Sequence, residues 1–283
     1  MAYTFDPFRE QMGRSYFGKS CKLTRDNLQY NALCCPVLCF YNIDICTMNK
    51  AIEKKHSISV ILPAYNEEEN IAQAIKITRQ TLYKYFDIVE IIVVNDGSVD
   101  HTPRLVNEIT RNFNDVRVIH HDRNKGYGAA LKSGFLHAEY ELIFFTDSDL
   151  QFDIDEIAHL LPLIKTYDIV SGYRNKRADS PLRLFNAWAW NRLVRVLLGI
   201  KAKDIDCAFK LFRKDVLDTL SLSSDGAMIN TEILALANKY NYSFHEVPVT
   251  HFPRARGEQS GANIGVVYKA FSELFTMYNS LKK

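Results

Sequence analysis

The sequence predicts an α/β domain built on a mostly parallel sheet with helices on its faces. After residue 56, apolar runs of strand length alternate with amphipathic stretches, and polar segments follow the apolar runs. This β-α-β-α alternation is typical of parallel sheets, whose crossover connections need a helix. The chain has 283 residues, 47% of them hydrophobic, which is enough to bury the core of one large domain or two modest ones.

Seven apolar runs are the predicted strands, and they lie at residues 58–62, 89–94, 116–120, 142–146, 169–172, 209–212 and 244–249. Helical patterns separate the first four of these runs, and they lie at residues 68–85, 102–112 and 128–138. Each pattern is long enough for a right-handed crossover. In such sheets ligands bind outside the carboxyl ends of the strands. The residues that directly follow each strand are therefore the candidates for chemistry.

Polar residues follow each of the first four predicted strands. The four segments are Pro63-Ala-Tyr-Asn-Glu67, Asn95-Asp-Gly-Ser98, His121-Asp-Arg-Asn-Lys-Gly126 and Asp147-Ser-Asp149. One such segment is ordinary turn chemistry, because Asn, Asp and Gly all serve turns well. Four of them at the same edge of one sheet indicate a ligand-binding crevice.

Asp147 and Asp149 directly follow the apolar run 142–146, so their carboxylates are expected close together at the sheet edge. Two neighbouring carboxylates repel each other unless a cation lies between them. Oxygen ligands with few protein donors suit Mg²⁺ or Mn²⁺, which keep waters and take further ligands from a diphosphate. The alternative is a cap for the helix that begins near Asp155, and Asp153 and Asp155 fit that role better than Asp147 does.

Gly126-Tyr-Gly128 precedes a predicted helix and superficially resembles a dinucleotide-binding fingerprint. A third glycine would be needed at position 131, which is Leu131, and the segment follows the third strand rather than the first. A dinucleotide-dependent dehydrogenase is therefore poorly supported. The helix N-terminus remains a place that favours negative charge.

Together these segments resemble the nucleotide-sugar half of the inverting family 2 glycosyltransferases, in particular the dolichol-phosphate mannose and glucose synthase group. The resemblance runs from about residue 57 to about residue 263. Besides the strand-end segments it rests on Asp96-Gly-Ser-Val-Asp100, Asn124-Lys-Gly-Tyr-Gly128, Asp147-Ser-Asp-Leu-Gln151, Ser171-Gly-Tyr-Arg174 and the run from Asp204 to Phe212. Ala208 stands where the family usually has glycine, and the family's later Arg-x-x-Gly-x-Ser-Lys motif is here Arg254-Ala-Arg-Gly-Glu-Gln-Ser260.

The resemblance implies a GT-A type (Rossmann-like) fold in a single catalytic domain. It also implies that Asp96 contacts the base or ribose of the donor, and that Tyr65 and Glu67 line the nucleotide pocket. Asp147, Asp149 and Gln151 would organise the metal ion, Mg²⁺ or Mn²⁺, and the sugar diphosphate. Pro63, Lys125 and Gly126 belong to the same motifs and are expected in the same donor site.

The implied reaction is metal-dependent transfer of a hexose from UDP-glucose or GDP-mannose to a polyprenyl phosphate of the dolichyl type. Such an acceptor oxygen is already anionic, so no strong general base is required. The departing diphosphate must be neutralised, which a metal ion and arginines can do. Arg174 and Arg254 are the expected catalytic arginines beside Asp149 and Gln151. Arg183 and Arg192 are further candidates for a phosphate clamp or are solvated surface residues.

Two other functions are alternatives. In the first, Glu232 is the base of a transferase that acts on a sugar hydroxyl, although Glu232 equally suits a helix start, where the dipole favours an acid. In the second, the chain is a nucleotide-sugar binding or pyrophosphorylase-like protein. That class expects a Gly-rich segment with Lys and Arg at the first strand, and the segment 63–67 is not of that kind.

The remaining segments suggest where the chain works. We expect an irregular N-terminal extension at 1–56, a catalytic domain at 57–263 and a C-terminal amphipathic helix at 264–283. A short polar run that begins near Met48 leads into the first strand, and the folded part of the catalytic domain is expected to start there. Five of the six cysteines precede the first predicted strand, which argues against a disulfide framework and suits a reducing compartment. No secretory signal is visible, and the longest apolar run, 33–41, is too short to span a membrane.

Charge and amphipathic pattern limit the partners. The formal charge of +2 does not call for nucleic acid, and the sequence does not indicate an oligomeric state. Residues 182–200 mix aromatic, aliphatic and arginine side chains, as helices at a membrane surface do. The apolar stripe at 264–278 suits a membrane and core packing equally well. We therefore expect a cytoplasmic protein with peripheral contact to the cytoplasmic face of a membrane.

Overall fold

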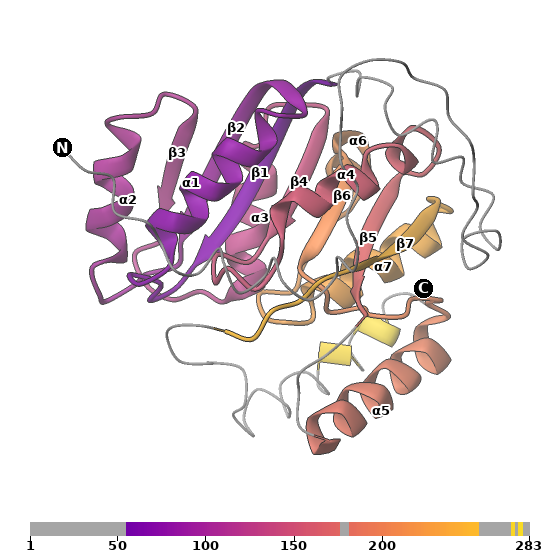
Figure 1. Ribbon diagram of the computed structural model, residues 1–283. Coiled ribbons are helices and arrows are strands. Elements are labelled where there is room, and N and C mark those ends of the chain that lie inside the picture. The colour runs from indigo at the N-terminus through magenta and orange to yellow at the C-terminus, as the bar shows by residue number, and fades with distance from the viewer. Residues whose placement is uncertain (1–54, 176–180, 255–272, 275–276, 280–283) are drawn as a thin grey trace, which may run out of the picture. The chain divides into compact units, whose positions relative to one another are not determined.

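A sheet of seven strands forms the centre of the protein in the computed structural model (Figure 1). The model describes residues 55–175, 181–254, 273–274 and 277–279, without the side chains of 55–56, 181–188 and 191. Nearly all of the expected N-terminal extension, most of the expected C-terminal helix and the residue Met48 lie outside this part. The described residues belong to one unit, 51–283.

The sheet has the order β3-β2-β1-β4-β6-β5-β7. Six strands are parallel to one another, and β6 is antiparallel to both of its neighbours. All seven predicted strands are confirmed, with β1 and β2 longer than expected. Their bounds are β1 (Lys55–Ala64), β2 (Phe86–Asn95), β3 (Val116–His120), β4 (Leu142–Thr146), β5 (Ile169–Arg174), β6 (Phe209–Arg213) and β7 (Phe244–Val249).

Helices cover both faces of the sheet. In Figure 1, α1 and α4 lie in front of it, and α3 and α7 lie behind it. The three predicted crossover helices are confirmed within a few residues at each end, and the predicted helix 182–200 corresponds to α5. The helices are α1 (Ile71–Leu82), α2 (Thr102–Thr110), α3 (Tyr127–His137), α4 (Ile157–Leu160), α5 (Pro181–Leu198), α6 (Lys214–Thr219) and α7 (Ile229–Lys239), with short 3₁₀ turns at Ile154–Glu156 and Leu163–Lys165.

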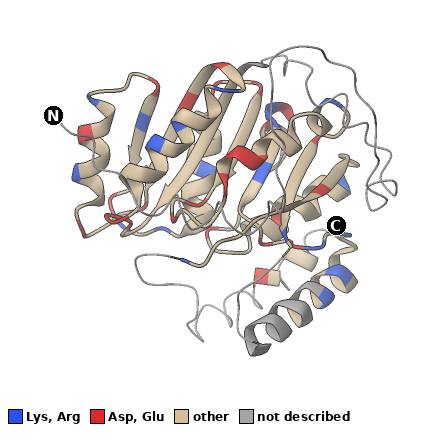
Figure 2. Ribbon diagram, viewed as in Figure 1, with Lys and Arg blue, Asp and Glu red and all other residues tan. Residues whose placement is uncertain are grey.

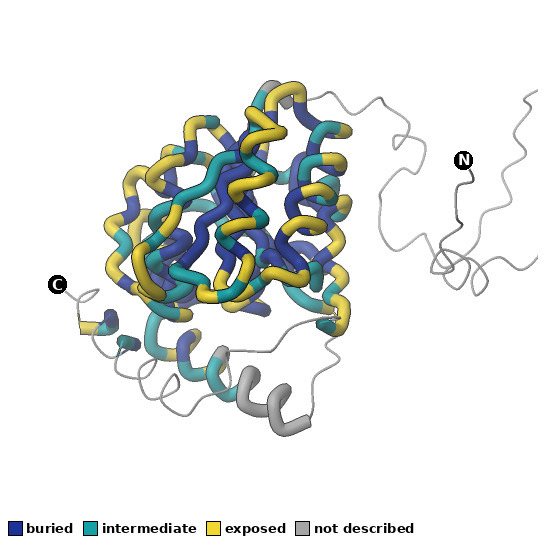
Figure 3. The backbone as a smooth tube through the Cα atoms, turned by 90° about the vertical axis from the view of Figure 1, so that its left-hand side faces the viewer, coloured by how far each residue is buried: buried dark blue, intermediate teal, exposed yellow. Residues whose placement is uncertain are grey.

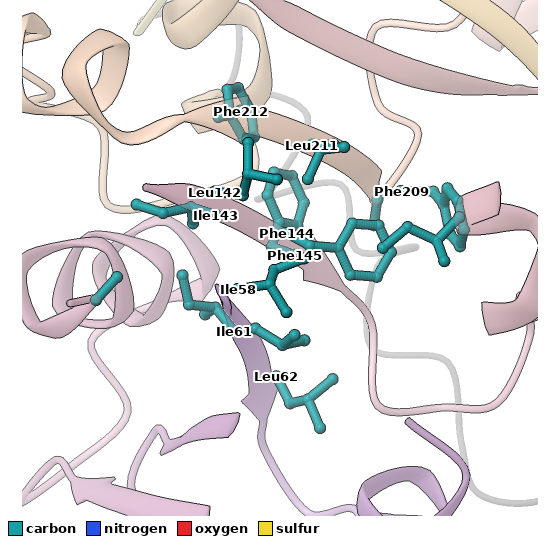
Figure 4. Close-up of a cluster of buried hydrophobic side chains, with 14 of the residues drawn as sticks. Ile58, Ile61, Leu62, Leu142, Ile143, Phe144, Phe145, Phe209, Leu211 and Phe212 are labelled. Atoms are coloured by element: carbon teal, nitrogen blue, oxygen red, sulfur yellow. The ribbon is translucent and has the colours of Figure 1, made fainter. Parts of the chain in front are cut away.

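The central strands are buried on both faces, which explains their continuous apolar sequences. Every residue of β4 is buried, and Figure 3 shows the buried strands enclosed by partly exposed helices. Phe144 of β4 meets Phe209 of β6 edge to face at 4.8 Å between ring centroids. On the other side of these strands Phe145 stacks on Phe212 at 5.9 Å (Figure 4). This aromatic packing fixes the end of β4 that precedes Asp147.

A second apolar cluster joins α5 and α7 to the C-terminal segment. Its buried members include Val194 of α5, Leu234 of α7, Leu274 and Met277. Leu274 and Met277 therefore contribute to the core, which agrees with core packing as the role of the apolar stripe at 264–278. Among the described residues, no helix combines the length and the apolarity needed to cross a bilayer.

Candidate functional site

The polar loops predicted at the strand ends lie at one edge of the sheet. The strands β2, β1 and β4 are adjacent and parallel, so their carboxyl ends open on the same side. Figure 2 shows acidic residues in the loops along that edge, which is the lower one in the view. The topology therefore places these strand-end segments at a shared edge of the sheet.

The loops after β1 and β2 are joined by hydrogen bonds between backbone and side chains. The Asn66 amide donates to Ser98 Oγ, and Val99 donates back to Asn66 Oδ1, both at 2.9 Å. The amide of Glu67 donates to Thr102 Oγ1 at 2.9 Å. Asn66 has a φ of 55°, a left-handed conformation that asparagine tolerates better than most residues. These bonds hold Glu67 at the edge of the sheet.

Asp96 connects the end of β2 to the loop before α3. Its Oδ1 accepts a hydrogen bond from the amide of Lys125, and its Oδ2 accepts one from the amide of Gly126, both at 2.8 Å. His121 Nδ1 lies 2.6 Å from Asp96 Oδ1, and His121 Nε2 lies 2.9 Å from Ser133 Oγ. Asp96 thus orders the segment 121–126 with a buried carboxylate.

Gly126 is required by its backbone and by its surroundings. Its φ is 104°, and a Cβ at this position would lie 2.3 Å from the carbonyl oxygen of Asp225. A non-glycine residue would be strained in this conformation and would collide with backbone. The first turn of α3 consequently packs directly on the loop that contains Asp225.

Asp147 is buried at the end of β4, and its Oδ1 accepts a hydrogen bond from the hydroxyl of Tyr127 at 3.0 Å. Burial, followed by the charge of Asp149, raises the pKa of Asp147 to about 7, against the opposing effects of Tyr127, Arg174 and Lys210. Burial also raises the pKa of Asp149, whose Oδ1 accepts a hydrogen bond from the amide of Gln151. Two such carboxylates at the same place are costly without a cation.

The donor set fits a hard divalent cation. Within the described part of the chain, no three His, Cys, Asp or Glu residues form a metal-binding group. Because their carboxylate oxygens are the ligands that these ions prefer, Asp147 and Asp149 would hold Mg²⁺ or Mn²⁺ as a pair and leave coordination positions for water and for a diphosphate. The predicted cap is separate from this pair, because Asp153 is the residue that caps the 3₁₀ turn, accepting from the amide of Asp155.

Arg254 reaches the same site from beyond β7. Its Nη2 donates to Glu67 Oε1 at 2.6 Å, and its Nη1 lies 3.8 Å from Asp149 Oδ2. The segment is held by Gln151, whose side-chain amide donates to the carbonyl of Phe252 at 2.9 Å and whose own carbonyl accepts from the amide of Phe252 at 2.7 Å. Glu67, Asp149, Gln151 and Arg254 are thus brought together.

Arg174, which is expected to be a catalytic arginine, is held by a carboxylate of the protein itself. Its guanidinium forms a bidentate pair with Asp204, with Nε to Oδ2 at 2.6 Å and Nη2 to Oδ1 at 2.7 Å. Glu246 of β7 accepts from the amides of Lys203 and Asp204 and so fixes this carboxylate. Arg174 contributes its positive charge near Asp147 from this fixed position.

The other predicted residues are peripheral to this cluster. Tyr65 is 39% exposed, and Lys125 pairs with the exposed Asp122 at 2.9 Å. Pro63 takes part through its carbonyl oxygen, which accepts from Ser148 Oγ at 2.8 Å. Arg192 is exposed on α5, and the side chain of Arg183 lies outside the described residues.

Three contributing residues were not predicted from sequence as members of the site. Tyr127 holds Asp147, His121 contacts Asp96, and Lys210 is fully buried in β6, from where its charge acts on Asp147. Lys210 Nζ donates to the carbonyl of Ile205 at 3.0 Å, to the carbonyl of Cys207, and to Asn230 Oδ1 at 3.2 Å. Its sequence signal is a lysine between the apolar residues Phe209 and Leu211 of β6.

Comparison with known proteins agrees with this geometry. A family model described as Glycosyl transferase family 2 matches residues 59–221, which is more than half of the chain. Glycosyltransferase AglD of Haloferax volcanii is 30% identical over 207 residues, covering 70% of this chain and 33% of that protein. An undecaprenyl-phosphate 4-deoxy-4-formamido-L-arabinose transferase of Pseudomonas fluorescens is 28% identical over 225 residues, covering 78% of this chain and 65% of that protein. The chain thus spans between one third and two thirds of the length of these relatives.

Solved structures share the fold. Glucosyl-3-phosphoglycerate synthase from Mycobacterium tuberculosis, in complex with Mn²⁺, UDP and phosphoglyceric acid, has a TM-score of 0.60 at 20% identity and covers 79% of this chain and 78% of that one. The same enzyme with Mg²⁺ and UDP has a TM-score of 0.59 at 18% identity, covering 79% and 80%. At this identity the likeness establishes the GT-A arrangement of the sheet and helices.

Proposed function

The chain belongs to glycosyl transferase family 2, and we propose that it transfers a hexose from UDP-glucose or GDP-mannose to a polyprenyl phosphate of the dolichyl type. The observation that carries this proposal is the buried pair Asp147 and Asp149 at the end of β4, with Arg254 beside it. The relative from Pseudomonas fluorescens is named for an undecaprenyl-phosphate acceptor. The solved structures of similar fold contain UDP with Mn²⁺ or Mg²⁺.

The donor end of the site is assigned to the loops after β1, β2 and β4. Asp147 and Asp149 would hold Mg²⁺ or Mn²⁺, and the bound ion would supply positive charge to the donor diphosphate. Asp96 orders the loop that contains Lys125 and Gly126, against which the nucleoside is expected to lie. Arg254 adds a cation next to Asp149, fixed by Glu67, so it needs no rearrangement as charge develops.

The transfer inverts the configuration at the sugar's C1 carbon. An oxygen of the acceptor phosphate forms the new bond to C1 while the bond from C1 to the donor diphosphate breaks, and the nucleoside diphosphate leaves with that electron pair. The acceptor oxygen carries its charge before the reaction, so no proton has to be removed. The chain must therefore neutralise the donor diphosphate and the acceptor phosphate and align them. A site that combines acidic residues, a metal ion and arginines suits this task.

The acceptor is proposed to arrive from the cytoplasmic face of a membrane. On α5, Arg192, Arg195 and Val196 are exposed, and Val196 is exposed to 73%. Cationic and aliphatic side chains on one helix favour binding to an anionic lipid surface. We assign the catalytic domain to residues 57–263 and the membrane contact to α5. Flotation of the protein with anionic liposomes, and its loss in Arg192→Glu with Arg195→Glu, tests this contact.

A donor and acceptor panel tests the function. The full chain is incubated with Mn²⁺, a short polyprenyl phosphate and either UDP-glucose or GDP-mannose, and the lipid product is identified by mass spectrometry. We expect a glycosylated lipid phosphate from one donor and none from the variant Asp149→Asn. Hydrolysis of every donor without lipid product would contradict the proposal.

A further inference from the structure

We propose that Glu232 is a positioning residue of the donor site, which holds the loop 223–226 against the first turn of α3. This inference rests on the proposed function and deepens it, because it excludes Glu232 as the base for a hydroxyl acceptor. The residue lies in the first turn of α7, where its side chain is buried and 5% exposed.

Both carboxylate oxygens of Glu232 accept hydrogen bonds from the loop. Oε1 accepts from the amide of Ser223 at 2.9 Å and from its hydroxyl at 2.5 Å, and Oε2 accepts from the amide of Ser224 at 2.8 Å. Hydrogen bonds to an ionised acceptor are stronger than neutral ones. Glu232 therefore fixes two consecutive residues of the loop with one side chain.

The loop in turn supports the start of α3. The amide of Ala129 donates to the carbonyl of Asp225 at 3.1 Å. Lys132 Nζ donates to the carbonyl of Ser223 at 3.2 Å and pairs with Asp225 Oδ1 at 2.7 Å. A Cβ at Gly128 would lie 2.5 Å from the carbonyl oxygen of Ser224, so the two backbones are in direct contact.

The same turn of α3 touches both acidic parts of the donor site. The amide of Gly126 donates to Asp96 Oδ2 at 2.8 Å, and the hydroxyl of Tyr127 donates to Asp147 Oδ1 at 3.0 Å. A continuous set of contacts thus runs from Glu232 through the loop and α3 to Asp96 and Asp147. A shift of the loop would move the groups that order the nucleoside and the metal ion.

The contacts of Glu232 do not suit a general base. A base must reach the proton it removes, whereas this carboxylate is buried and directed to three donors of its own loop. A phosphate acceptor, moreover, has no proton to lose at the attacking oxygen. The geometry therefore agrees with an anionic acceptor and a supporting role for Glu232.

The test compares Glu232→Gln with Ser223→Ala in the full chain. In Glu232→Gln, the side-chain NH₂ group cannot accept a hydrogen bond from the backbone amide that it faces. Ser223→Ala removes only the hydrogen bond from the hydroxyl, so it serves as the milder variant if Glu232→Gln fails to fold. We measure the affinity for UDP and GDP with Mn²⁺ by calorimetry, together with donor KM, kcat and the pH profile of kcat. The expected result for Glu232→Gln is an affinity loss and KM increase of about tenfold, a smaller fall in kcat and an unchanged pH profile, with Ser223→Ala intermediate.

Asp168→Asn is the matched control. Asp168 Oδ2 accepts from the amide and the hydroxyl of Ser243, both at 2.7 Å, directly before β5 and β7 and hence at the opposite end of the sheet. Asp168→Asn also weakens hydrogen bonds between a carboxylate and a serine, and it is expected to lower thermal stability without changing nucleotide affinity.

Four outcomes would overturn the inference. A kcat loss of about 10²- to 10⁴-fold in Glu232→Gln with unchanged nucleotide affinity would identify a base. Equal affinity losses in Glu232→Gln and Asp168→Asn would show a general effect of lost stability. If the wild-type chain binds neither UDP nor GDP with Mn²⁺, the proposed function fails and the inference fails with it. If the wild type binds a nucleotide and both Glu232→Gln and Ser223→Ala bind it equally well, the inference alone is refuted.

Discussion

Arg254 and Glu67 are 187 positions apart in the chain, yet Arg254 Nη2 donates to Glu67 Oε1 at 2.6 Å with both side chains largely buried. The pair joins the loop after β1 to the segment after β7, across the width of the sheet. Asn70 donates to the other oxygen of Glu67 at 2.8 Å. Arg254 is therefore held in place before any ligand arrives.

Replacement of Arg254 by Ala should lower kcat/KM by about 10²-fold or more, as removal of one preorganised charge-stabilising group does in other enzymes. It should also cost about 1.5–3 kcal/mol of stability, because a charged hydrogen bond is lost. Arg254→Lys should recover part of the activity. Arg104→Ala, which breaks an exposed pair with Glu108, is the control and should behave as wild type. Full activity in Arg254→Ala would remove this residue from the site.

Metal removal should abolish transfer. Treatment with EDTA is expected to stop product formation, and added Mn²⁺ or Mg²⁺ should restore it, because the diphosphate loses its counter-charge without the ion. Thermal shift measurements should show that Mn²⁺ with UDP or GDP raises the Tm of the wild type. Asp147→Asn and Asp149→Asn should lose both the recovery of transfer by added metal and the rise in Tm with metal and nucleotide. Transfer that persists in EDTA would contradict the metal assignment.

Gly126→Ala should destabilise the protein and weaken nucleotide binding. The left-handed φ of 104° and the collision with the carbonyl of Asp225 should together cost at least about 1–3 kcal/mol. Gly199→Ala is a matched control, since Gly199 also has a positive φ, of 69°, but among the described residues the nearest atom that a Cβ there would meet is Asn238 Nδ2, at 3.8 Å. We expect the control to show a smaller fall in Tm and an unchanged nucleotide Kd, both measured under the same conditions. Equal effects of the two substitutions would argue against close packing at Gly126.

Cys207 should resist alkylation in the folded protein at pH 8. Burial raises the pKa of its thiol from 9.0 to about 12, and the thiolate is the reactive form. Because the folded-state pKa is raised, the thiol stays protonated while the unfolded chain ionises, so folding loses stability as pH rises from about 9 to about 12. Mass spectrometry of the Cys207 peptide after iodoacetamide treatment, with and without denaturant, checks the protection. Rapid native labelling would show that the loop before β6 opens.

The strands and the acidic edge were predictable because both are local signals. Buried parallel strands read as continuous apolar runs, and their bounds match closely for β3, β4 and β7. The crossover helices α1 to α3 have one apolar face each and were also predicted. No bounds are predicted for α7, although Glu232 suits a helix start, and most residues of this helix are buried.

The partners of the charged residues were not predictable, since each pair joins distant segments. Arg174 was expected among the catalytic arginines, but its bidentate partner Asp204, which follows α5 in the chain, could not be foreseen. The carboxylate of Glu232 is a group that can act as a general base, but it accepts its hydrogen bonds from Ser223 and Ser224 of the neighbouring loop. Such differences depend on which side chains the fold brings together, and residue type alone does not specify them.

The reversed direction of β6 has a consequence for how this protein can diversify. β5 ends at Arg174 and β6 begins at Phe209, and because the two strands are antiparallel both points lie at the same edge of the sheet. The chain between them leaves and returns at the edge where the donor loops gather. A change in the length of this stretch would therefore leave the pairing of β5 with β6 intact, and we expect it to act on the acceptor side proposed for α5 rather than on the strands.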